Sequence, residues 1–234
     1  MKLVLLPGMD GTGDLLTPFV KELDERGIAS QVISYPTDVV LGYEELIERV
    51  SSALPEDDEL VLLGESFSGP IALALAQRDT PGLRGLVLVV TFAEAPDSML
   101  LQLTRVLPVK WILSQPVPCW MAHKLMLGEV RPKTNQEALC RVIKNISPEV
   151  IAERLRAVRE LKLSPQPTDL PSLYIQGTRD SLLPESALES VERLVPRLRV
   201  ERVEGPHLVL DIEPGRCAEL VSEFISSLSA EIHR

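Results

Sequence analysis

The chain has 234 residues, of which 45% are hydrophobic, 25% are charged and only 4% are aromatic, and its formal net charge at pH 7 is −10. This length suits one domain with a substantial core, and the composition is that of an ordinary globular protein. Sequence-independent binding to nucleic acid depends on Lys and Arg, so the negative charge argues against a nucleic-acid partner.

The N-terminal sequence and the cysteines bear on cellular location. The first two residues lead into only four apolar residues, Leu3–Leu6, which is too short for the hydrophobic region of a signal peptide. The longest β-rich apolar run, Leu86–Val90, has the length of a strand and not of a membrane span. Cys119, Cys140 and Cys217 are odd in number and lack metal-ligand spacing, which predicts free thiols in a reducing compartment. We therefore expect a cytoplasmic protein without stable membrane insertion.

Short runs rich in Leu and β-branched residues alternate with longer amphipathic stretches, which predicts a parallel sheet covered by helices. In chain order, the expected elements are strand Lys2–Leu6, helix Leu15–Arg26, strand Gln31–Ser34, helix Tyr43–Leu54, strand Glu59–Leu63, helix Pro70–Gln77, strand Leu86–Val90, strand 171–176, helix Pro184–Leu194, strand Arg197–Val203 and helix Pro214–Leu228. Within the first helix, apolar residues recur at helical spacing, and Gly27 provides a C-terminal stop. The sequence thus predicts about six strands.

The stretch from about residue 95 to residue 169 breaks this alternation. It contains no convincing strand, and helical segments such as Gln136–Lys144 and Pro148–Leu161 lie between its prolines. We interpret residues 95–169 as a helical cap that is inserted after the fourth predicted strand and covers the end of the sheet. The core then consists of residues 1–94 and 170–234.

The predicted cap is strongly apolar and holds both tryptophans and three of the five methionines. One interpretation is an adaptable apolar pocket for an acyl chain, with Trp111, Trp120 and Met121 as substrate-binding residues. The other is that any helical cap must bury apolar side chains against the sheet edge, whatever it binds. The sequence leaves both alternatives open.

A Gly-Glu-Ser-Phe-Ser-Gly motif directly follows the third predicted strand, and an Ala- and Leu-rich helix follows the motif. This is the context of a nucleophile elbow, in which Ser66 would point out at the carboxyl edge of the sheet and the Phe67 amide would face a developing oxyanion. Side chains at Gly64 and Gly69 would collide with the neighbouring strand and helix. The alternative is a tight turn whose small residues serve packing alone. Glu65 is expected to face away from the site and to find a local partner.

A serine hydroxyl needs a base near neutral pH, and histidine, with an unperturbed pKa of about 6.5, suits this task. The sequence has three histidines. His233 is the residue before the last, where chains usually fray, and His123 lies within the predicted cap. His207 follows the sixth predicted strand, in a Gly-Pro loop before the last helix. Position and elimination therefore favour His207 as the base, with an ordinary surface-loop histidine as the alternative.

The base needs a carboxylate that fixes its tautomer. Asp180 comes immediately after the fifth predicted strand, at the same edge as Ser66 and His207, and the order Ser, Asp, His is the one that follows a nucleophile elbow. Asp211 is the main competitor, but we expect it to cap the last helix. Asp169 precedes the fifth strand and would lie at the opposite edge.

The first predicted strand leads into a glycine-rich loop, Pro7–Gly13, that opens a helix. An acyl-transfer site needs a second oxyanion donor beside the Phe67 amide. Gly8 lets the loop turn tightly over the serine, so the Met9 amide is the expected donor. Phosphate binding is the alternative, but the loop lacks the Lys-Ser/Thr ending of a P-loop and the spacing of a dinucleotide-binding motif.

Leu-Pro-Gly-Met-Asp-Gly-Thr-Gly and Gly-Glu-Ser-Phe-Ser-Gly, together with Ser66, Asp180 and His207 in this order, make the chain resemble the α/β-hydrolase superfamily. The motifs look particularly like those of the hydrolase domain of plant phytyl ester synthase and diacylglycerol acyltransferase-like proteins, and they are also similar to small bacterial carboxylesterases. The resemblance implies an α/β-hydrolase fold, with a reduced, mostly parallel sheet of about six strands flanked by helices and a helical cap. It also implies oxyanion donors at Met9 and Phe67.

The chain departs from the superfamily pattern in two places. The first strand already leads into the oxyanion loop, so the two leading antiparallel strands of the superfamily are expected to be missing. Many relatives have His-Gly in this loop where this chain has Pro7-Gly8. The amide donor survives that change, whereas a side-chain role for the histidine does not.

The resemblance implies acyl transfer in two steps, without a metal or an organic cofactor. Ser66 attacks an ester carbonyl, His207 moves the proton to the leaving alcohol, and water then clears the acyl-enzyme. We expect a carboxylic ester hydrolase whose partner is a small apolar ester with a short to medium acyl chain. Acyl transfer to an alcohol, thioester cleavage, and a non-catalytic ligand receptor on the same scaffold stay open, as does the oligomeric state.

Overall fold

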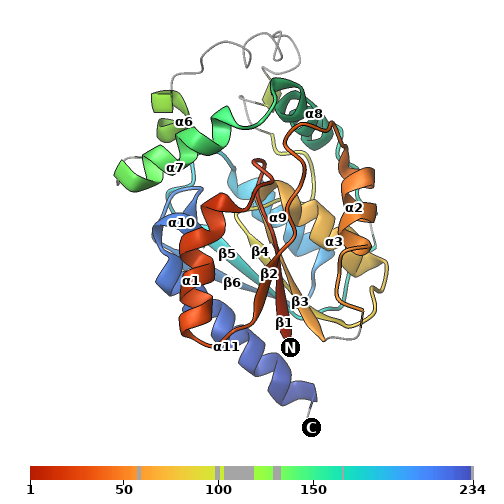
Figure 1. Cartoon of the computed structure of the whole chain (residues 1–234). Coiled ribbons are helices and arrows are strands. Elements are labelled where there is room, and N and C mark those ends of the chain that lie inside the picture. Colours follow the sequence, from red (N-terminus) through yellow and green to blue (C-terminus); the bar gives the residue numbers. More distant parts are fainter. Residues whose placement is uncertain (57–58, 98–100, 103–118, 129–132, 165, 233–234) are drawn as a thin grey trace.

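The structure is a computed structural model that describes residues 1–56, 59–97, 101–102, 119–128, 133–164 and 166–232. Within these residues a six-stranded, wholly parallel sheet has the strand order β2-β1-β3-β4-β5-β6 (Figure 1). The strands are β1 Lys2–Leu6, β2 Ser30–Val32, β3 Leu60–Glu65, β4 Leu83–Val89, β5 Ser172–Gly177 and β6 Leu198–Val203. The predicted α/β architecture with about six strands is confirmed.

Both faces of the sheet are buried, as expected of parallel strands that read as continuous apolar runs. In β3, Leu60 and Leu62 pack into the core on one side of the sheet, and Val61 and Leu63 pack into the core on the other. β3 lies between β1 and β4. The motif that follows β3 therefore emerges near the middle of the carboxyl edge.

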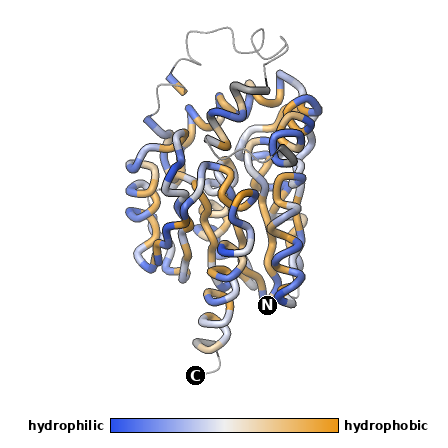
Figure 2. Tube along the Cα trace, turned by 90° about the vertical axis from the view of Figure 1, so that its left-hand side faces the viewer, coloured by the Kyte–Doolittle hydropathy of each residue, from blue (hydrophilic) through white to orange (hydrophobic). Residues whose placement is uncertain are grey.

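Separate sets of helices cover the two faces (Figure 1). One face is covered by α1 Thr17–Glu25 and α11 Pro214–Ile232, and the other by α2 Tyr43–Ser51, α3 Gly69–Gln77 and α9 Glu185–Leu194. Figure 2 shows hydrophobic residues concentrated on the strands and on the inner sides of the helices. The arrangement follows from amphipathic helices that bury one stripe each against a sheet that is apolar on both sides.

Three described helices follow β4 in the chain and precede β5: α6 Cys119–Met126, α7 Lys133–Lys144 and α8 Pro148–Arg159. They lie beyond the carboxyl ends of the strands (Figure 1). Leu139 of α7 and Val150 of α8 share a buried cluster with Leu15 and Leu208, which come from segments following β1 and β6. The helical character of this region matches the prediction, whereas the boundaries of a separate cap at residues 95 and 169 stay a prediction.

Two differences from the predicted elements have local causes. A short helix, α10 Val209–Ile212, was not expected, because four residues are too few to show a helical period. Asp211 lies inside this helix and not at the start of α11, so the expectation that it caps the last helix is wrong. β4 ends at Val89, because Val90 adopts a positive φ of 42° that turns the chain out of the sheet.

The cysteines also differ from the prediction of free thiols. Cys140, on α7, is disulfide-bonded, whereas Cys217, on α11, is free and buried. The side chain of Cys119 lies outside the described residues. The expectation was wrong for Cys140 because the spacing of cysteines along a chain does not show which positions lie close together in the fold.

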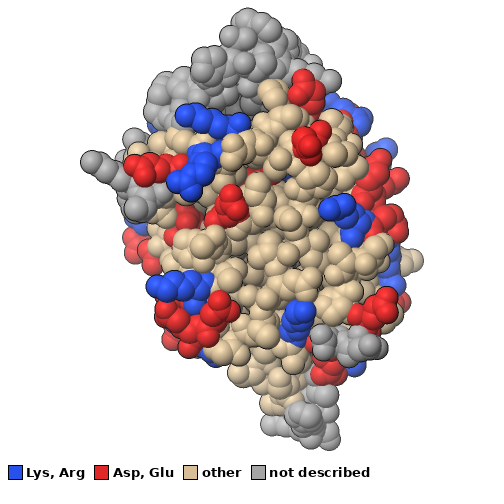
Figure 3. All heavy atoms as spheres, in the orientation of Figure 1, with Lys and Arg blue, Asp and Glu red and all other residues tan. Residues whose placement is uncertain are grey.

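Acidic and basic side chains are interspersed over the face of the molecule shown in Figure 3, without a large area of one sign. Several exposed charges pair one helical turn apart, as Lys21 does with Glu25 at 3.6 Å. Among the described helices, none is long and apolar enough to cross a membrane.

Candidate active site

The Gly-Glu-Ser-Phe-Ser-Gly motif forms a sharp turn between β3 and α3. Ser66 has a φ of 48°, a left-handed conformation that is uncommon for residues with a side chain and typical of strained functional turns. A Cβ atom at Gly64 would lie 2.7 Å from the Ser68 carbonyl oxygen, and one at Gly69 would overlap the side chain of Thr91. The prediction that side chains do not fit at these two glycines is confirmed. Close packing on both sides therefore fixes the turn that carries Ser66.

Three side chains from the carboxyl edge of the sheet form one chain of hydrogen bonds. Ser66 Oγ lies 2.8 Å from His207 Nε2, and His207 Nδ1 lies 2.7 Å from Asp180 Oδ2. Asp180 follows β5 and His207 follows β6. The other carboxylate oxygen, Oδ1, accepts from the backbone amides of Leu182 and Leu183, at 2.8 and 3.3 Å. Because the carboxylate accepts from Nδ1–H, Nε2 is free to accept the serine proton.

The electrostatics of the pair favour a charged histidine beside a charged aspartate. Burial alone would lower the pKa of His207, but the charge of Asp180 and its hydrogen bond outweigh burial, and the pKa is raised above 6.5. Burial alone would raise the pKa of Asp180, but His207 and the two backbone amides lower it below its ordinary value of 3.8. The aspartate therefore stays ionised while the histidine gains and loses a proton.

The other acids and bases considered in the sequence lie elsewhere. His123 is on α6, with Nε2 3.0 Å from the Gln136 carbonyl oxygen, and His233 is outside the described residues. Asp169 precedes β5 and lies at the opposite edge. Asp211 accepts a hydrogen bond from the Asn135 amide at 2.7 Å.

The loop after β1 is held at two peptide groups, Pro7–Gly8 and Met9–Asp10, on either side of the Gly8–Met9 peptide. The Ser68 hydroxyl donates to the Pro7 carbonyl oxygen, and the Gly8 amide donates to Glu65 Oε2 at 3.2 Å. On the far side of the next peptide, the Met9 carbonyl oxygen accepts from a buried guanidinium. These contacts bracket the Met9 amide, the predicted oxyanion donor.

The second predicted oxyanion donor is the backbone amide of Phe67, and this residue is also held in place by its neighbours. Phe67 is fully buried, and its ring stacks on that of Tyr43 with 4.7 Å between the ring centroids. The Tyr43 hydroxyl also donates to the Phe67 carbonyl oxygen at 3.0 Å. Whether Met9 and Phe67 bind an oxyanion stays a prediction.

Glu65 does not behave as expected from the sequence. Its side chain is only 4% exposed, and its partner is the Gly8 amide, 57 residues away. Burial and the charge of Asp10 raise its pKa to about 7, although His207 opposes the shift. The expectation of an outward side chain with a local partner is wrong because the loop after β1 covers the end of β3. A carboxylate within an otherwise apolar strand end was the available sequence signal.

Arg154 is a second residue that sequence reasoning missed. It belongs to α8, is 1% exposed, and donates from Nη1 to the Met9 carbonyl oxygen at 2.6 Å and from Nη2 to the Pro36 carbonyl oxygen at 2.9 Å. No local pattern distinguished it from the other arginines of this amphipathic helix.

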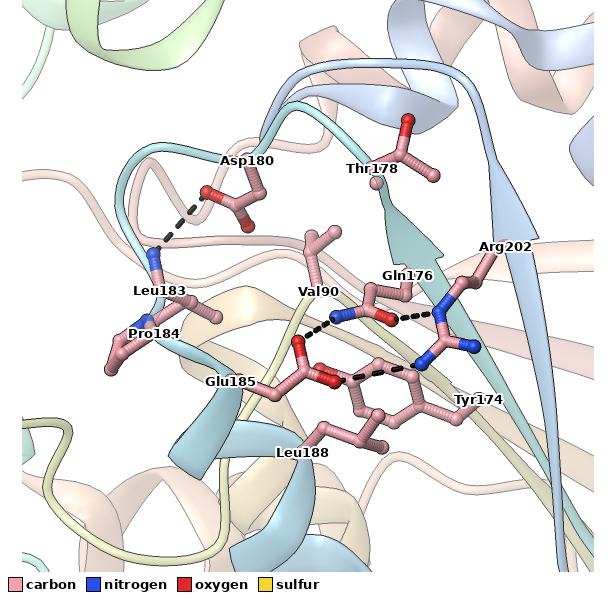
Figure 4. Close-up of a pocket in the computed structure, with 11 residues that line it drawn as sticks. Val90, Tyr174, Gln176, Thr178, Asp180, Leu183, Pro184, Glu185, Leu188 and Arg202 are labelled. Atoms are coloured by element: carbon pink, nitrogen blue, oxygen red, sulfur yellow. Dashed lines mark hydrogen bonds and ion pairs between the residues drawn. The ribbon is translucent and has the colours of Figure 1, made fainter.

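A cavity of about 330 Å³ lies beside Asp180, between the ends of β5 and β6 and the start of α9 (Figure 4). Gln176 crosses it, donating to Glu185 Oε2 and accepting from Arg202 Nε, each at 2.9 Å. Asp180 is among its described lining residues and Ser66 is not, so the cavity lies on the side of Asp180 away from Ser66.

The side chains predicted to bind the substrate lie outside the described part of the chain. This applies to Trp111 and to the side chains of Trp120 and Met121, so their role in binding stays a prediction. Among the described residues, no group of His, Cys, Asp and Glu side chains could hold a metal ion.

Comparison with solved structures places the fold among bacterial hydrolases. A thermophilic esterase from Thermogutta terrifontis, with malate bound, has a TM-score of 0.78 and 21% identity, and the match covers 97% of this chain and 90% of that one. An esterase from Exiguobacterium antarcticum has a TM-score of 0.77 and 15% identity, and the match covers 97% of this chain and 92% of that one. A lipase-esterase related protein from Clostridium acetobutylicum has a TM-score of 0.76 and 14% identity, and the match covers 95% of this chain and 93% of that one. At such identities the likeness establishes the α/β-hydrolase fold alone.

Sequence comparison names the family. Among curated protein sequences, none matches the chain. The profile of the Hydrolase_4 family, described as serine aminopeptidase, S33, matches residues 23–208, which is more than half of the 234 residues. The matched region includes β3 with its elbow, β4, β5, β6 and all three residues of the hydrogen-bonded chain. Profile and fold agree, and the chain belongs to the Hydrolase_4 family within the α/β-hydrolase superfamily.

Proposed function

We propose that this protein is a serine-dependent carboxylic ester hydrolase. The observation that carries the proposal is the continuous hydrogen-bonded chain from Ser66 through His207 to Asp180, on a strained turn at the carboxyl edge of the sheet. Serine is a weak nucleophile without an adjacent base, and this arrangement supplies the base and orients it. The bacterial esterases that share the fold support the same reaction class.

The proposed mechanism has two half-reactions that use the same groups. Ser66 Oγ attacks the ester carbonyl carbon while His207 Nε2 takes the hydroxyl proton, and the amides of Met9 and Phe67 donate to the oxyanion. The tetrahedral intermediate collapses, His207 protonates the leaving alcohol, and an acyl-enzyme remains. A water molecule then loses its proton to His207, attacks the acyl carbon, and the acid leaves as Ser66 regains its proton.

The proposed substrate is a small ester with a short to medium apolar acyl chain. This part of the proposal rests on the apolar composition of residues 95–169, which follow β4 and include Trp111 and Trp120. An apolar wall with few polar groups selects acyl chains by length more than by chemistry.

A chain-length series of p-nitrophenyl esters tests the proposal on purified protein. We expect wild-type turnover with a maximum at short or medium chains, and a loss of at least about 10⁴-fold in kcat/KM for Ser66→Ala. Ser226→Ala, at an exposed serine of α11, is the matched control and should retain wild-type activity. Absence of ester turnover by the wild type, or equal turnover by Ser66→Ala, would refute it.

Two further measurements define the reaction. Alanine p-nitroanilide tests amide cleavage, because the family description is that of an aminopeptidase. Product analysis with added alcohol separates hydrolysis from acyl transfer, since transfer yields a new ester at the expense of the acid. Hydrolysis predicts that the free acid dominates in both conditions.

A further inference from the structure

Arg154 is a buried charge that the proposed mechanism does not use. Its side chain is 1% exposed, and it is the largest fully buried side chain among the described residues. Burying a guanidinium is costly unless its N–H groups are well paired, and an apolar residue of similar size usually fills such space at lower cost. A buried arginine at this position is therefore expected to have a specific role.

One of its hydrogen bonds reaches the loop after β1, and the other reaches the segment after β2. Nη1 donates to the Met9 carbonyl oxygen at 2.6 Å, and Nη2 donates to the Pro36 carbonyl oxygen at 2.9 Å. The Cζ atom lies 5.7 Å from the centroid of the Tyr35 ring and 5.9 Å from that of the Phe67 ring, within cation–π range. The guanidinium thus lies between the loop and the residue that follows the nucleophile.

The loop is shaped around this guanidinium. Gly11 has a φ of +74°, and a Cβ atom there would lie 2.7 Å from Arg154 Nη1 and 2.8 Å from Nη2. Only glycine lets the backbone turn so closely around the charged group. The fit is therefore made by residues on both sides, the arginine from α8 and the glycine from the loop.

Arg154 completes a set of three contacts around one peptide group. The Pro7 carbonyl and the Gly8 amide are held by Ser68 and Glu65, two residues of the nucleophile turn. The Met9 carbonyl is held by Arg154. The Gly8–Met9 peptide, whose amide is the proposed oxyanion donor, lies between the held groups, so its direction depends on both ends being fixed.

We propose that Arg154 is a positioning residue for the oxyanion hole, through which helix α8 sets the direction of the Met9 amide. The inference rests on the proposed function, because an oxyanion forms only if Ser66 attacks a carbonyl. It follows that the sheet and its loops do not form the oxyanion hole without α8. The loop after β1 adopts the required conformation only when α8 packs against it. A displacement of a donor by about 1 Å is enough to cost about 10²-fold in rate.

The test compares Arg154→Met with Arg156→Met. Arg156 lies on the same helix but is 53% exposed and pairs with Glu153 and Glu160. For Arg154→Met we expect kcat on the best p-nitrophenyl ester to fall about 10²-fold with KM changed by less than about threefold, because the lost interaction acts in the transition state. Arg156→Met should match the wild type.

A thionoester of the same acid gives a readout that a merely structural role would not move. Its developing charge lies on sulfur, which accepts hydrogen bonds from amides poorly, so an intact oxyanion hole discriminates strongly in favour of the oxygen ester. Arg154→Met should reduce this oxygen-to-sulfur ratio of kcat/KM toward one. A reduced kcat with an unchanged ratio would overturn the proposal and leave Arg154 a stabilising residue.

Further measurements keep the inference testable if the methionine variant folds poorly. Arg154→Lys retains the charge but not the planar pair of N–H donors, and its kcat should lie between those of the wild type and Arg154→Met. Added guanidinium at a non-denaturing concentration should restore part of the kcat of Arg154→Ala. Amide hydrogen exchange at residues 8–13 should accelerate in Arg154→Met or Arg154→Lys but not in Arg156→Met. Unchanged exchange there would overturn the inference, whereas absence of ester turnover by the wild type would instead refute the proposed function.

Discussion

In the proposed mechanism, the protonation of His207 decides whether Ser66 can act as a nucleophile. The Asp180 carboxylate accepts from Nδ1 at 2.7 Å and leaves Nε2, at 2.8 Å from Ser66 Oγ, as the acceptor. The histidine is 4% exposed, so its charged form has little water around it and depends on Asp180 for stabilisation. In the proposed mechanism, His207 can take the Ser66 proton only while it is neutral.

The pH dependence of kcat/KM should report this proton. Burial lowers the pKa of His207, but Asp180 raises it by more, so the net pKa lies above the ordinary 6.5. The base gains activity as it loses its proton. We therefore expect kcat/KM to rise with pH and to reach half its maximum above pH 6.5, as measured with a p-nitrophenyl ester.

Asp180→Asn separates the two causes of this shift. Loss of the carboxylate leaves only the charge of Glu65 to oppose burial, so the pKa of His207 should fall and the acidic limb should move to lower pH. kcat should fall about 10⁴-fold because the tautomer is no longer fixed. Asp169→Asn, at the opposite edge of the sheet, is the control and should leave the profile unchanged. An acidic limb that stays in place in Asp180→Asn would contradict the assigned pair.

At the scale of elements, the turn that carries Ser66 depends on the contact between α3 and the segment after β4. α3 begins at Gly69, and Thr91 lies directly against it. The Thr91 hydroxyl also donates to the Ser66 carbonyl oxygen, and its amide donates to the Tyr174 hydroxyl at 3.1 Å. Thr91 thus links the turn to β5, and the position of Ser66 depends on the approach that Gly69 allows.

Gly69→Ala should disturb this contact. The added Cβ atom would overlap the Thr91 side chain, and overpacking of this kind costs about 1–3 kcal/mol of unfolding free energy, or more where backbone must move. Urea denaturation measures the loss, and kcat should fall as well because the Ser66 carbonyl loses its donor. Gly215→Ala, in α11, is the control, since its nearest contact would be an ordinary 3.5 Å to Glu22. Equal stability of the two variants would contradict the close approach.

At the scale of the whole molecule, burial of ionisable groups near one edge of the sheet makes stability depend on pH. Burial raises the pKa of Glu65 to about 7 and also raises the pKa of Asp211. The pKa of His207 is raised as well, because the charge of Asp180 outweighs the opposite effect of burial. In each case the folded protein binds a proton more tightly than the unfolded chain. The stabilisation is therefore complete below the unfolded pKa and is lost as the pH rises through the folded pKa.

The free energy of unfolding should consequently fall between about pH 5 and pH 8. Asp180 contributes no slope there, because its lowered pKa confines its effect to pH values below the ordinary 3.8. Glu65→Gln keeps an acceptor for the Gly8 amide but cannot titrate. We expect this variant to be more stable than the wild type at pH 8, by roughly 1–3 kcal/mol, and to show a flatter profile in urea denaturation.

Glu25→Gln, at an exposed glutamate of α1, provides the matched control for Glu65→Gln. It removes the same charge from the surface and should leave the slope between pH 5 and pH 8 as in the wild type. A wild-type profile that rises across this range, or a steep profile in Glu65→Gln, would show that Glu65 is not the buried acid described here.

The sequence by itself determined the parts of this protein that depend on near neighbours. The alternation of apolar strands and amphipathic helices predicted the parallel sheet, since each element shows its buried face in its own period. The motif around Ser66 predicted a strained turn with glycine at both ends, because the steric demand is local. Chain order and strand ends also pointed to Asp180 and His207, which the structure places within hydrogen-bond distance of each other.

Only the tertiary structure decided what depends on contacts between distant segments. Glu65 finds its partner 57 residues away, and Arg154 finds Met9 145 residues away, at distances where no period or turn signal extends. The disulfide at Cys140 also depends on tertiary contact, whereas Asp211 was misjudged because the four residues of α10 are too few to show a helical period. The sequence therefore predicted Ser66, His207 and Asp180 as nucleophile, base and acid, whereas Glu65 and Arg154, which hold the loop after β1, were found only in the folded structure.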